Sequence, residues 1–137
     1  MRLFVYGTLK EGFPNFATNR GTRVPGEFRT LAPYLLYLVG PRCVPWMLTA
    51  AAGGQPITGQ VFDVDAAMLE DMDRLERVGL PGGYRRVEIP VERVDAPGRL
   101  TVFAYLKDES ELTADLERVG PLSVYTAEHA SRYRIPG

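Results

Sequence analysis

Short apolar or alternating segments, most of them bounded by glycine or proline, recur along the whole chain and restrict the folds open to it. Such segments are typical of β-strands, and we expect about six or seven of them. They are residues 3–6, 27–29, 34–39, 45–48, 57–64, 84–94 and 99–106. Strands so closely spaced predict a mixed or antiparallel sheet that curls or closes, with helices added, and therefore an α+β fold. The glycine-rich loop at 79–83 precedes a strand rather than a helix, which argues against a dinucleotide-binding βαβ unit.

One helix is predicted between the fifth and sixth strands, with Asp65 as its N-cap and its end at Gly79. At about 100° per residue, apolar side chains fill one arc of this helix. These are Met68, Leu69, Met72 and Leu75. We also expect a single helical turn over residues 14–19 and a short helix around Leu112 and Leu116.

Glu76 falls inside the apolar arc of the predicted helix, where a carboxylate is out of place. It also lies near the helix C-terminus, where the macrodipole disfavours negative charge. Partial burial and the dipole would both raise its pKa, which suits a general base near neutral pH. The alternative is a rim position whose carboxylate reaches water or pairs with an arginine such as Arg85 or Arg86. Helix geometry alone favours the rim position, because periodic patterns place charges imperfectly.

The first strand breaks at Gly7 into the segment Thr8-Leu9-Lys10-Glu11-Gly12. A glycine turn at the C-terminal end of a strand exposes several backbone N–H groups together, and these can bind an anion or an oxyanion. The same pattern occurs in most domains, so taken alone it favours an ordinary connecting turn.

Charge and composition exclude several classes of function. Sixteen basic and seventeen acidic residues give a net charge of −1 without a basic patch, so neither nucleic acid nor an anionic membrane is an expected partner. No apolar run approaches the length of a membrane span. One cysteine, Cys43, and one histidine, His129, leave no internal disulfide and no protein-built zinc site. We therefore expect a cytoplasmic single domain over residues 1–137, without metal or cofactor, that relies on carboxylates, hydroxyls and backbone groups.

The segment Tyr6-Gly7-Thr8-Leu9-Lys10 resembles the signature of the gamma-glutamyl cyclotransferase-like family, and most of all that of its gamma-glutamylamine cyclotransferase members. Further stretches match in the same order over nearly the whole chain. They are residues 14–15, 29–34, 44–48, 59–65, 68–76, 83–86 and 102–105, with the pair Arg132-Tyr133. The collinear set is far more specific than any one stretch.

This resemblance implies a small mixed β-barrel with flanking helices. It also implies a reaction in which the α-amine of a gamma-glutamyl amine attacks its own γ-carbonyl, releasing 5-oxoproline and a free amine. Glu76 takes the position of the family's catalytic glutamate, acting as general base and then as general acid. The substrate-binding loop corresponds to Tyr6, Gly7, Thr8 and Leu9, and the pocket lining that we expect beside it is Trp46 and Tyr105.

One departure from the family pattern is Phe16, which stands where the eukaryotic members carry a histidine and bears on the choice of leaving amine. Two alternative functions remain. The same chemistry would remove a gamma-glutamyl protecting group from a biosynthetic intermediate, such as an aminoglycoside precursor. A non-catalytic domain that binds a small ligand is the other alternative, and the combination of Glu76 with the loop at 6–9 argues against it, because binding alone needs no base.

Overall fold

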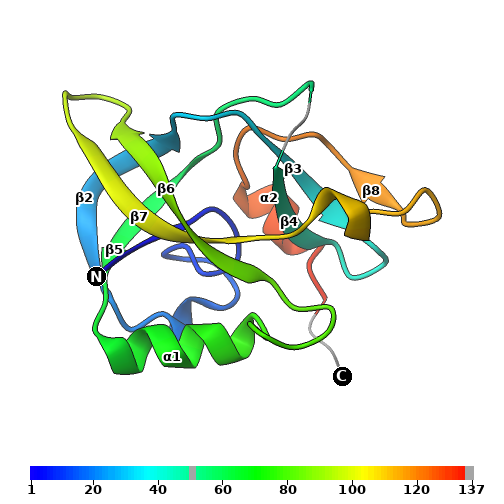
Figure 1. Ribbon diagram of the computed structural model, residues 1–137, viewed down its shortest axis with the longest axis horizontal. Coiled ribbons are helices and arrows are strands. Elements are labelled where there is room, and N and C mark those ends of the chain that lie inside the picture. Colours follow the sequence, from blue (N-terminus) through cyan, green and yellow to red (C-terminus); the bar gives the residue numbers. More distant parts are fainter. Residues whose placement is uncertain (50–51, 135–137) are drawn as a thin grey trace.

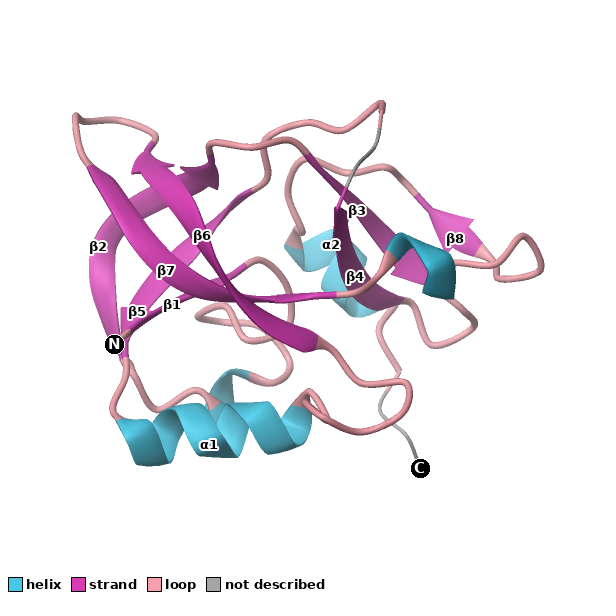
Figure 2. Ribbon diagram, in the orientation of Figure 1, coloured by secondary structure: helices cyan, strands magenta, loops and turns pink. Residues whose placement is uncertain are grey.

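A five-stranded barrel, closed by a parallel pairing between its first and last strands, forms one half of the molecule (Figures 1 and 2). The computed structural model describes residues 1–49 and 52–134. In barrel order the strands are β1 (Arg2–Val5), β5 (Thr58–Asp63), β2 (Thr22–Thr30), β6 (Arg85–Arg93) and β7 (Arg99–Leu106). All neighbours are antiparallel except β1 and β7, which pair in parallel at Leu3 and Phe103. The expected small mixed barrel is therefore confirmed.

A second sheet stands beside the barrel, in the order β4-β3-β8 (Figure 1). Its strands are β3 (Tyr34–Val39), β4 (Val44–Thr49) and the two-residue β8 (Arg118–Val119). The last barrel strand reaches this sheet, because the Lys107 N–H donates to the Met47 carbonyl at 2.9 Å. The junction between barrel and second sheet frames the site described below.

The strand β1 is buried on both of its faces. Phe4 points into the barrel, while Leu3 and Val5 pack beneath the helix α1 (Ala66–Leu75), against Leu69 and Met72. Burying each such side chain contributes about 1.5–3 kcal/mol. Three of the four residues of the predicted apolar arc, Met68, Leu69 and Met72, cover the barrel, and Asp65 caps the start of the helix by accepting from the Met68 N–H at 2.8 Å.

Most predicted strands agree with the structure to within two residues, and β2 is the main exception. It runs over Thr22–Thr30 rather than 27–29. Pro25 and Gly26 interrupt the alternating pattern there, and the pairing with β5 shifts register between Val24 and Phe28. Such a bulge bends a strand without ending it, which is why the sequence pattern showed only its second half.

The segment after β7 differs more from expectation. The short helix predicted around Leu112 and Leu116 is wrong, because the chain forms instead the 3-10 turn η2 (Glu109–Glu111), which ends at Leu112. An unpredicted helix, α2 (Ala127–Ser131), follows the N-cap Thr126. The helical turn expected over 14–19 is present as η1 (Phe16–Thr18). Within residues 1–49 and 52–134, no helix has the length and apolar character needed to span a membrane.

Candidate active site

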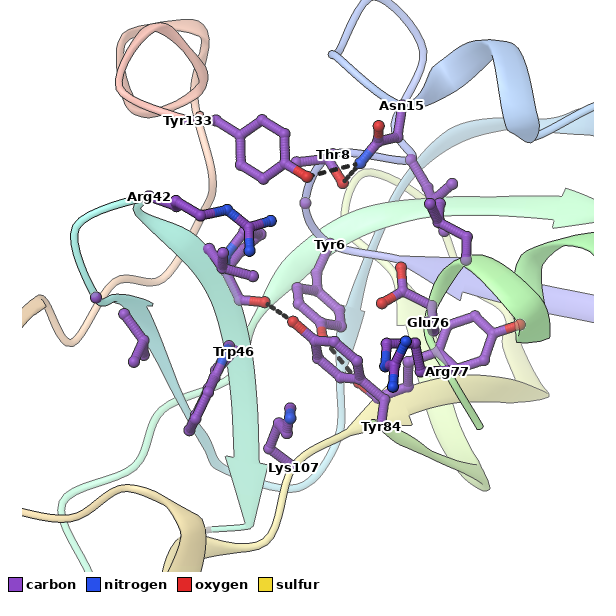
Figure 3. A pocket seen from close by; sticks show the side chains of 18 of the residues that line it. Tyr6, Thr8, Asn15, Arg42, Trp46, Glu76, Arg77, Tyr84, Lys107 and Tyr133 are labelled. Carbon is purple, nitrogen blue, oxygen red and sulfur yellow. Dashed lines mark hydrogen bonds between the residues drawn. The ribbon is translucent and has the colours of Figure 1, made fainter. Parts of the chain in front are cut away.

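A cavity of about 370 Å³ opens where the barrel meets the second sheet (Figure 3). Its walls come from the turn after β1, the β3–β4 turn, the end of α1, the loop before β6 and the end of β7. All seven residues singled out from the sequence line it, namely Tyr6, Gly7, Thr8, Leu9, Trp46, Glu76 and Tyr105. The helix end and the glycine turn, 67 or more positions apart in the chain, therefore face one space.

Glu76 reaches this cavity because α1 ends earlier than predicted. The helix stops at Leu75, with Glu76 as its C-cap, rather than continuing to Gly79. Leu75, which was assigned to the buried arc, is instead 39% exposed and lines the cavity. The Glu76 carboxylate therefore projects from the C-terminal end of the helix into the cavity and is not packed beneath the helix with Leu69 and Met72.

The helix end is built as a Schellman motif around Arg77. The Val78 N–H donates to the Asp73 carbonyl at 3.0 Å, and the Arg77 N–H donates to the Arg74 carbonyl at 3.2 Å. Arg77 itself has a φ of 56°, a left-handed conformation that glycine usually supplies at this position. The chain therefore reverses immediately after Glu76, and Arg77 also lines the cavity.

The loop that follows Arg77 is held against it by a close glycine contact. A Cβ on Gly83 would lie 1.9 Å from the Arg77 carbonyl oxygen, so only glycine fits there. The next residue, Tyr84, donates its backbone N–H to the Glu76 carbonyl at 2.9 Å and its hydroxyl to the Pro45 carbonyl at 2.7 Å. Tyr84 consequently joins the helix end to the strand β4 across the cavity.

The Glu76 side chain is half-buried, and burial raises the pKa of its carboxyl to about 7, although Lys107 acts in the opposite direction. The arginines proposed as rim partners are engaged elsewhere. Arg85 pairs with Asp108 at 2.6 Å, and Arg86 pairs with Asp73. In the described part of the chain, Glu76 forms no ion pair. The structure thus leaves a carboxyl that exchanges its proton near neutral pH open to the cavity.

The turn after β1 carries backbone donors that have no acceptor among the described residues. Across residues 1–49 and 52–134, no acceptor takes a hydrogen bond from the N–H groups of Gly7, Thr8 or Leu9. The carbonyls of the turn are used, since Gly7 accepts from Lys10 at 3.1 Å and Thr8 from Asn15 at 2.8 Å. Because Thr8 and Leu9 are buried, leaving their N–H groups without a partner is costly. These groups can therefore bind an anionic oxygen in the cavity.

The turn itself is fixed from two sides. The Asn15 side chain donates to the Thr8 hydroxyl at 2.8 Å and to the Tyr133 hydroxyl at 3.3 Å, which draws the C-terminal segment over the cavity (Figure 3). A Cβ on Gly7 would approach the Pro45 ring to 2.8 Å. Lys10 of the predicted signature does not line the cavity and donates to the Tyr125 carbonyl instead.

Lys107, which sequence reasoning did not identify, lies on the cavity wall with 3% of its surface exposed. Its ammonium stands 4.5 Å from the centre of the Trp46 ring and 4.9 Å from that of Tyr84, and it donates to the Gly82 carbonyl. Contacts of this kind between a cation and an aromatic face stabilise a desolvated charge. The sequence offers no signal for this role, because a lysine after an apolar strand is ordinarily a solvated residue.

Two of the lining tyrosines use their hydroxyls for structure. The Tyr6 hydroxyl donates to the Tyr105 carbonyl at 2.8 Å, and the Tyr105 hydroxyl donates to Asp73 on α1 at 2.7 Å. Asn15, Arg42, Tyr84 and Tyr133 also line the cavity. Of these, only Arg42 lies outside the motifs quoted above. Within the described ranges, no three His, Cys, Asp or Glu side chains are grouped so that they could hold a metal ion.

The sequence matches the model of the family described as "Gamma-glutamyl cyclotransferase, AIG2-like" over residues 3–124. The chain belongs to this family. It is 36% identical over 117 residues to gamma-glutamylaminecyclotransferase B of Danio rerio, covering 80% of this chain and 60% of the relative. With the Homo sapiens gamma-glutamylaminecyclotransferase the identity is 38% over 103 residues, covering 70% and 66% of the two chains. The match therefore spans slightly less than two thirds of the length of these gamma-glutamyl cyclotransferase-like relatives.

A solved structure in the same family has the same fold. The crystal structure of an AIG2-like protein from Mus musculus superposes with a TM-score of 0.69 at 29% sequence identity, covering 77% of this chain and 76% of the other.

Proposed function

We propose that this protein is a gamma-glutamylamine cyclotransferase with Glu76 as its proton-transfer residue. The observation that carries the proposal is the meeting of two features in one cavity. A carboxyl whose pKa is raised to about 7 lines the same cavity as Gly7, Thr8 and Leu9, whose N–H groups have no acceptor in the described chain. The Danio rerio and Homo sapiens relatives are named for this activity, which supports the same assignment.

The reaction needs little beyond this pair of features. The carboxylate of Glu76 takes a proton from the α-ammonium of the glutamyl group, and the freed amine attacks the γ-carbonyl carbon. A C–N bond closes the five-membered ring, and Glu76 passes its proton to the departing nitrogen as the bond to the leaving amine breaks. The ring nitrogen then gives up its second proton, which Glu76 relays to the released amine. The products are 5-oxoproline and the amine as its ammonium ion, so atoms and charge balance.

A carboxyl with a pKa near 7 serves both steps at neutral pH, because it accepts and returns a proton with small driving forces. Nucleophile and electrophile belong to one molecule, so the protein supplies neither. Its main contribution is to hold the glutamyl chain bent for ring closure, and positioning of this kind is worth several kcal/mol, up to about 7–11 kcal/mol.

The turn at 7–9 would bind either the negative oxygen that develops on the γ-carbonyl or the α-carboxylate of the glutamyl group. Tyr6 shapes the wall beside it, since burial raises the pKa of its phenol well above the usual value and keeps the hydroxyl a neutral donor to Tyr105. Trp46 and Tyr105 complete the lining. We propose a cytoplasmic location as well, on the basis of the single cysteine, Cys43.

The test is to incubate the purified protein with gamma-glutamyl-ε-lysine and other gamma-glutamyl amines and to measure 5-oxoproline. Glu76→Gln is expected to fold and to lower turnover by about a hundredfold or more. Glu70→Gln is the matched control, because Glu70 lies exposed on the same helix and outside the cavity. Turnover of Glu76→Gln near the wild-type rate would contradict the mechanism. Binding without any 5-oxoproline would favour the non-catalytic alternative.

A further inference from the structure

The charged groups that line the cavity are unevenly balanced. Four charged side chains line it, and three of them are cationic, namely Arg42, Arg77 and Lys107, against the single carboxylate of Glu76. Lys107 has partners of its own, since it donates to the Gly82 carbonyl and lies 3.6 Å from the Glu111 carboxylate. Two guanidinium groups therefore give the cavity its excess positive charge.

Neither guanidinium is neutralised by a carboxylate of the described residues. In the part of the chain that the structure describes, Arg42 and Arg77 form no ion pair. Under the proposed function, the glutamyl part of the substrate brings one ammonium and one carboxylate. The ammonium is matched by Glu76, and the carboxylate uses one cation or the turn at 7–9. At least one arginine then remains without an anion.

Arg42 is placed to meet the other half of the substrate. It lies on the β3–β4 turn, and Figure 3 shows it entering from the wall opposite Glu76 and Arg77. Pro41 and Arg42 are exposed, whereas Thr8 and Leu9 are buried, so the glutamyl group belongs in the buried part and the leaving amine at the Arg42 side.

Hydrogen bonds to Arg134 hold the Arg42 side chain in place and leave its terminal nitrogens available to a ligand. Its Nε donates to the Arg134 carbonyl at 3.1 Å, while the Arg134 N–H donates to the Arg42 carbonyl at 2.9 Å. These two bonds fix the base of the side chain to the C-terminal segment. The terminal nitrogens of the guanidinium have no bond to an acceptor within the described residues, which leaves a planar pair of donors of the kind that binds a carboxylate.

We propose, building on the proposed function, that Arg42 is the specificity-determining residue on the leaving-amine side of the cavity and that it selects amines carrying a carboxylate. A polycationic amine, such as an aminoglycoside precursor, is disfavoured, because it would place further positive charge beside two arginines.

Three conjugates of matched length test this: gamma-glutamyl-4-aminobutyrate, its neutral carboxamide, and gamma-glutamylputrescine, which is cationic. We expect kcat/KM to favour the carboxylate over the carboxamide by about tenfold or more, as a charge-assisted hydrogen bond provides. The kcat/KM for gamma-glutamylputrescine should be the lowest of the three. Equal kcat/KM for all three would overturn the inference and leave the proposed function standing. No 5-oxoproline from any conjugate would overturn both.

The Arg42→Gln variant tests whether Arg42 causes the preference for the carboxylate conjugate over the carboxamide. It is expected to bring the ratio of kcat/KM for carboxylate over carboxamide from about ten to about one. Arg99→Gln, at an exposed arginine on β7 outside the cavity lining, should keep the wild-type ratio. Thermal unfolding of both variants monitors folding. If Arg42→Gln lowered kcat/KM for both conjugates equally, Arg42 would act on the glutamyl half, and the inference would be overturned.

Discussion

The backbone N–H of Tyr84 donates to the carbonyl of Glu76 at 2.9 Å, which fastens the residue after the glycine loop to the last residue of the helix end. Because the Tyr84 hydroxyl also donates to Pro45, one tyrosine spans from the proposed base to the second sheet. The position of the Glu76 carboxylate therefore depends on how tightly the loop at 79–83 closes.

Gly83→Ala tests that dependence. The new Cβ would fall 1.9 Å from the Arg77 carbonyl oxygen, a backbone atom that cannot move aside alone. We expect a loss of about 1–3 kcal/mol of stability and about a tenfold fall in kcat/KM, as Glu76 and Tyr84 shift. Urea unfolding and 5-oxoproline release measure the two effects.

Gly79→Ala is the control for that substitution. Gly79 has a φ of 81°, but a Cβ added there would meet no atom within 4 Å, so alanine costs only the left-handed conformation, about 1–2 kcal/mol. Its activity should stay close to the wild type. Equal activity losses in the two variants would show that general loop strain, rather than the contact with Arg77, governs the site.

The pH dependence of activity follows from the pKa of Glu76. A general base with a pKa of about 7 is protonated below that pH, so kcat/KM should fall about tenfold per pH unit on the acid side. A kcat/KM profile from pH 5 to pH 9 locates the midpoint. A midpoint near 4.5, the ordinary value for glutamate, would mean that the carboxyl is not desolvated in solution.

Lys107→Met should move that midpoint. The Lys107 ammonium lowers the pKa of Glu76, so its removal should raise the pKa and shift the acid limb to higher pH. Lys107→Arg keeps the charge and should keep the limb near its wild-type position. If Lys107→Met folds normally and the midpoint of its kcat/KM profile does not move, Lys107 has no effect on the pKa of Glu76. Its role would then be limited to its contacts with Trp46 and Tyr84.

Glu76→Gln is also predicted to change stability. Burial raises the pKa of Glu76 from 4.5 to about 7, so the folded protein retains a proton there that the unfolded chain releases. Wild-type stability therefore falls as the pH rises between these values. The neutral glutamine avoids this loss and should be more stable than the wild type by about 1–3 kcal/mol near pH 8, with little difference near pH 4.5. Urea unfolding at the two pH values measures it, and equal stability near pH 8 would contradict a buried carboxylate.

Strands with clean patterns were predictable because alternation and bounding glycines or prolines are local signals. The strands over Tyr34–Val39 and Arg99–Leu106 agree residue for residue with the prediction. The second half of α1 was less predictable. Nothing local marks Arg77 as the left-handed residue that ends the helix, since glycine or asparagine normally occupies that position. The loop that follows packs back on this turn, since the Leu80 N–H donates to the Arg77 carbonyl at 3.0 Å and Gly83 lies too close to it for any side chain.

By itself, the sequence determined the α+β class, the mixed barrel through its collinear family motifs, and the two segments that supply the proposed chemistry, the turn at Gly7 and the helix end at Glu76. Tertiary structure decided that these segments share one cavity and that Arg42 and Lys107 join them there. The reason is physical. Strand and helix patterns arise from neighbours along the chain, whereas the raised pKa of Glu76 and the excess charge of the cavity depend on burial and on groups brought together only by barrel closure.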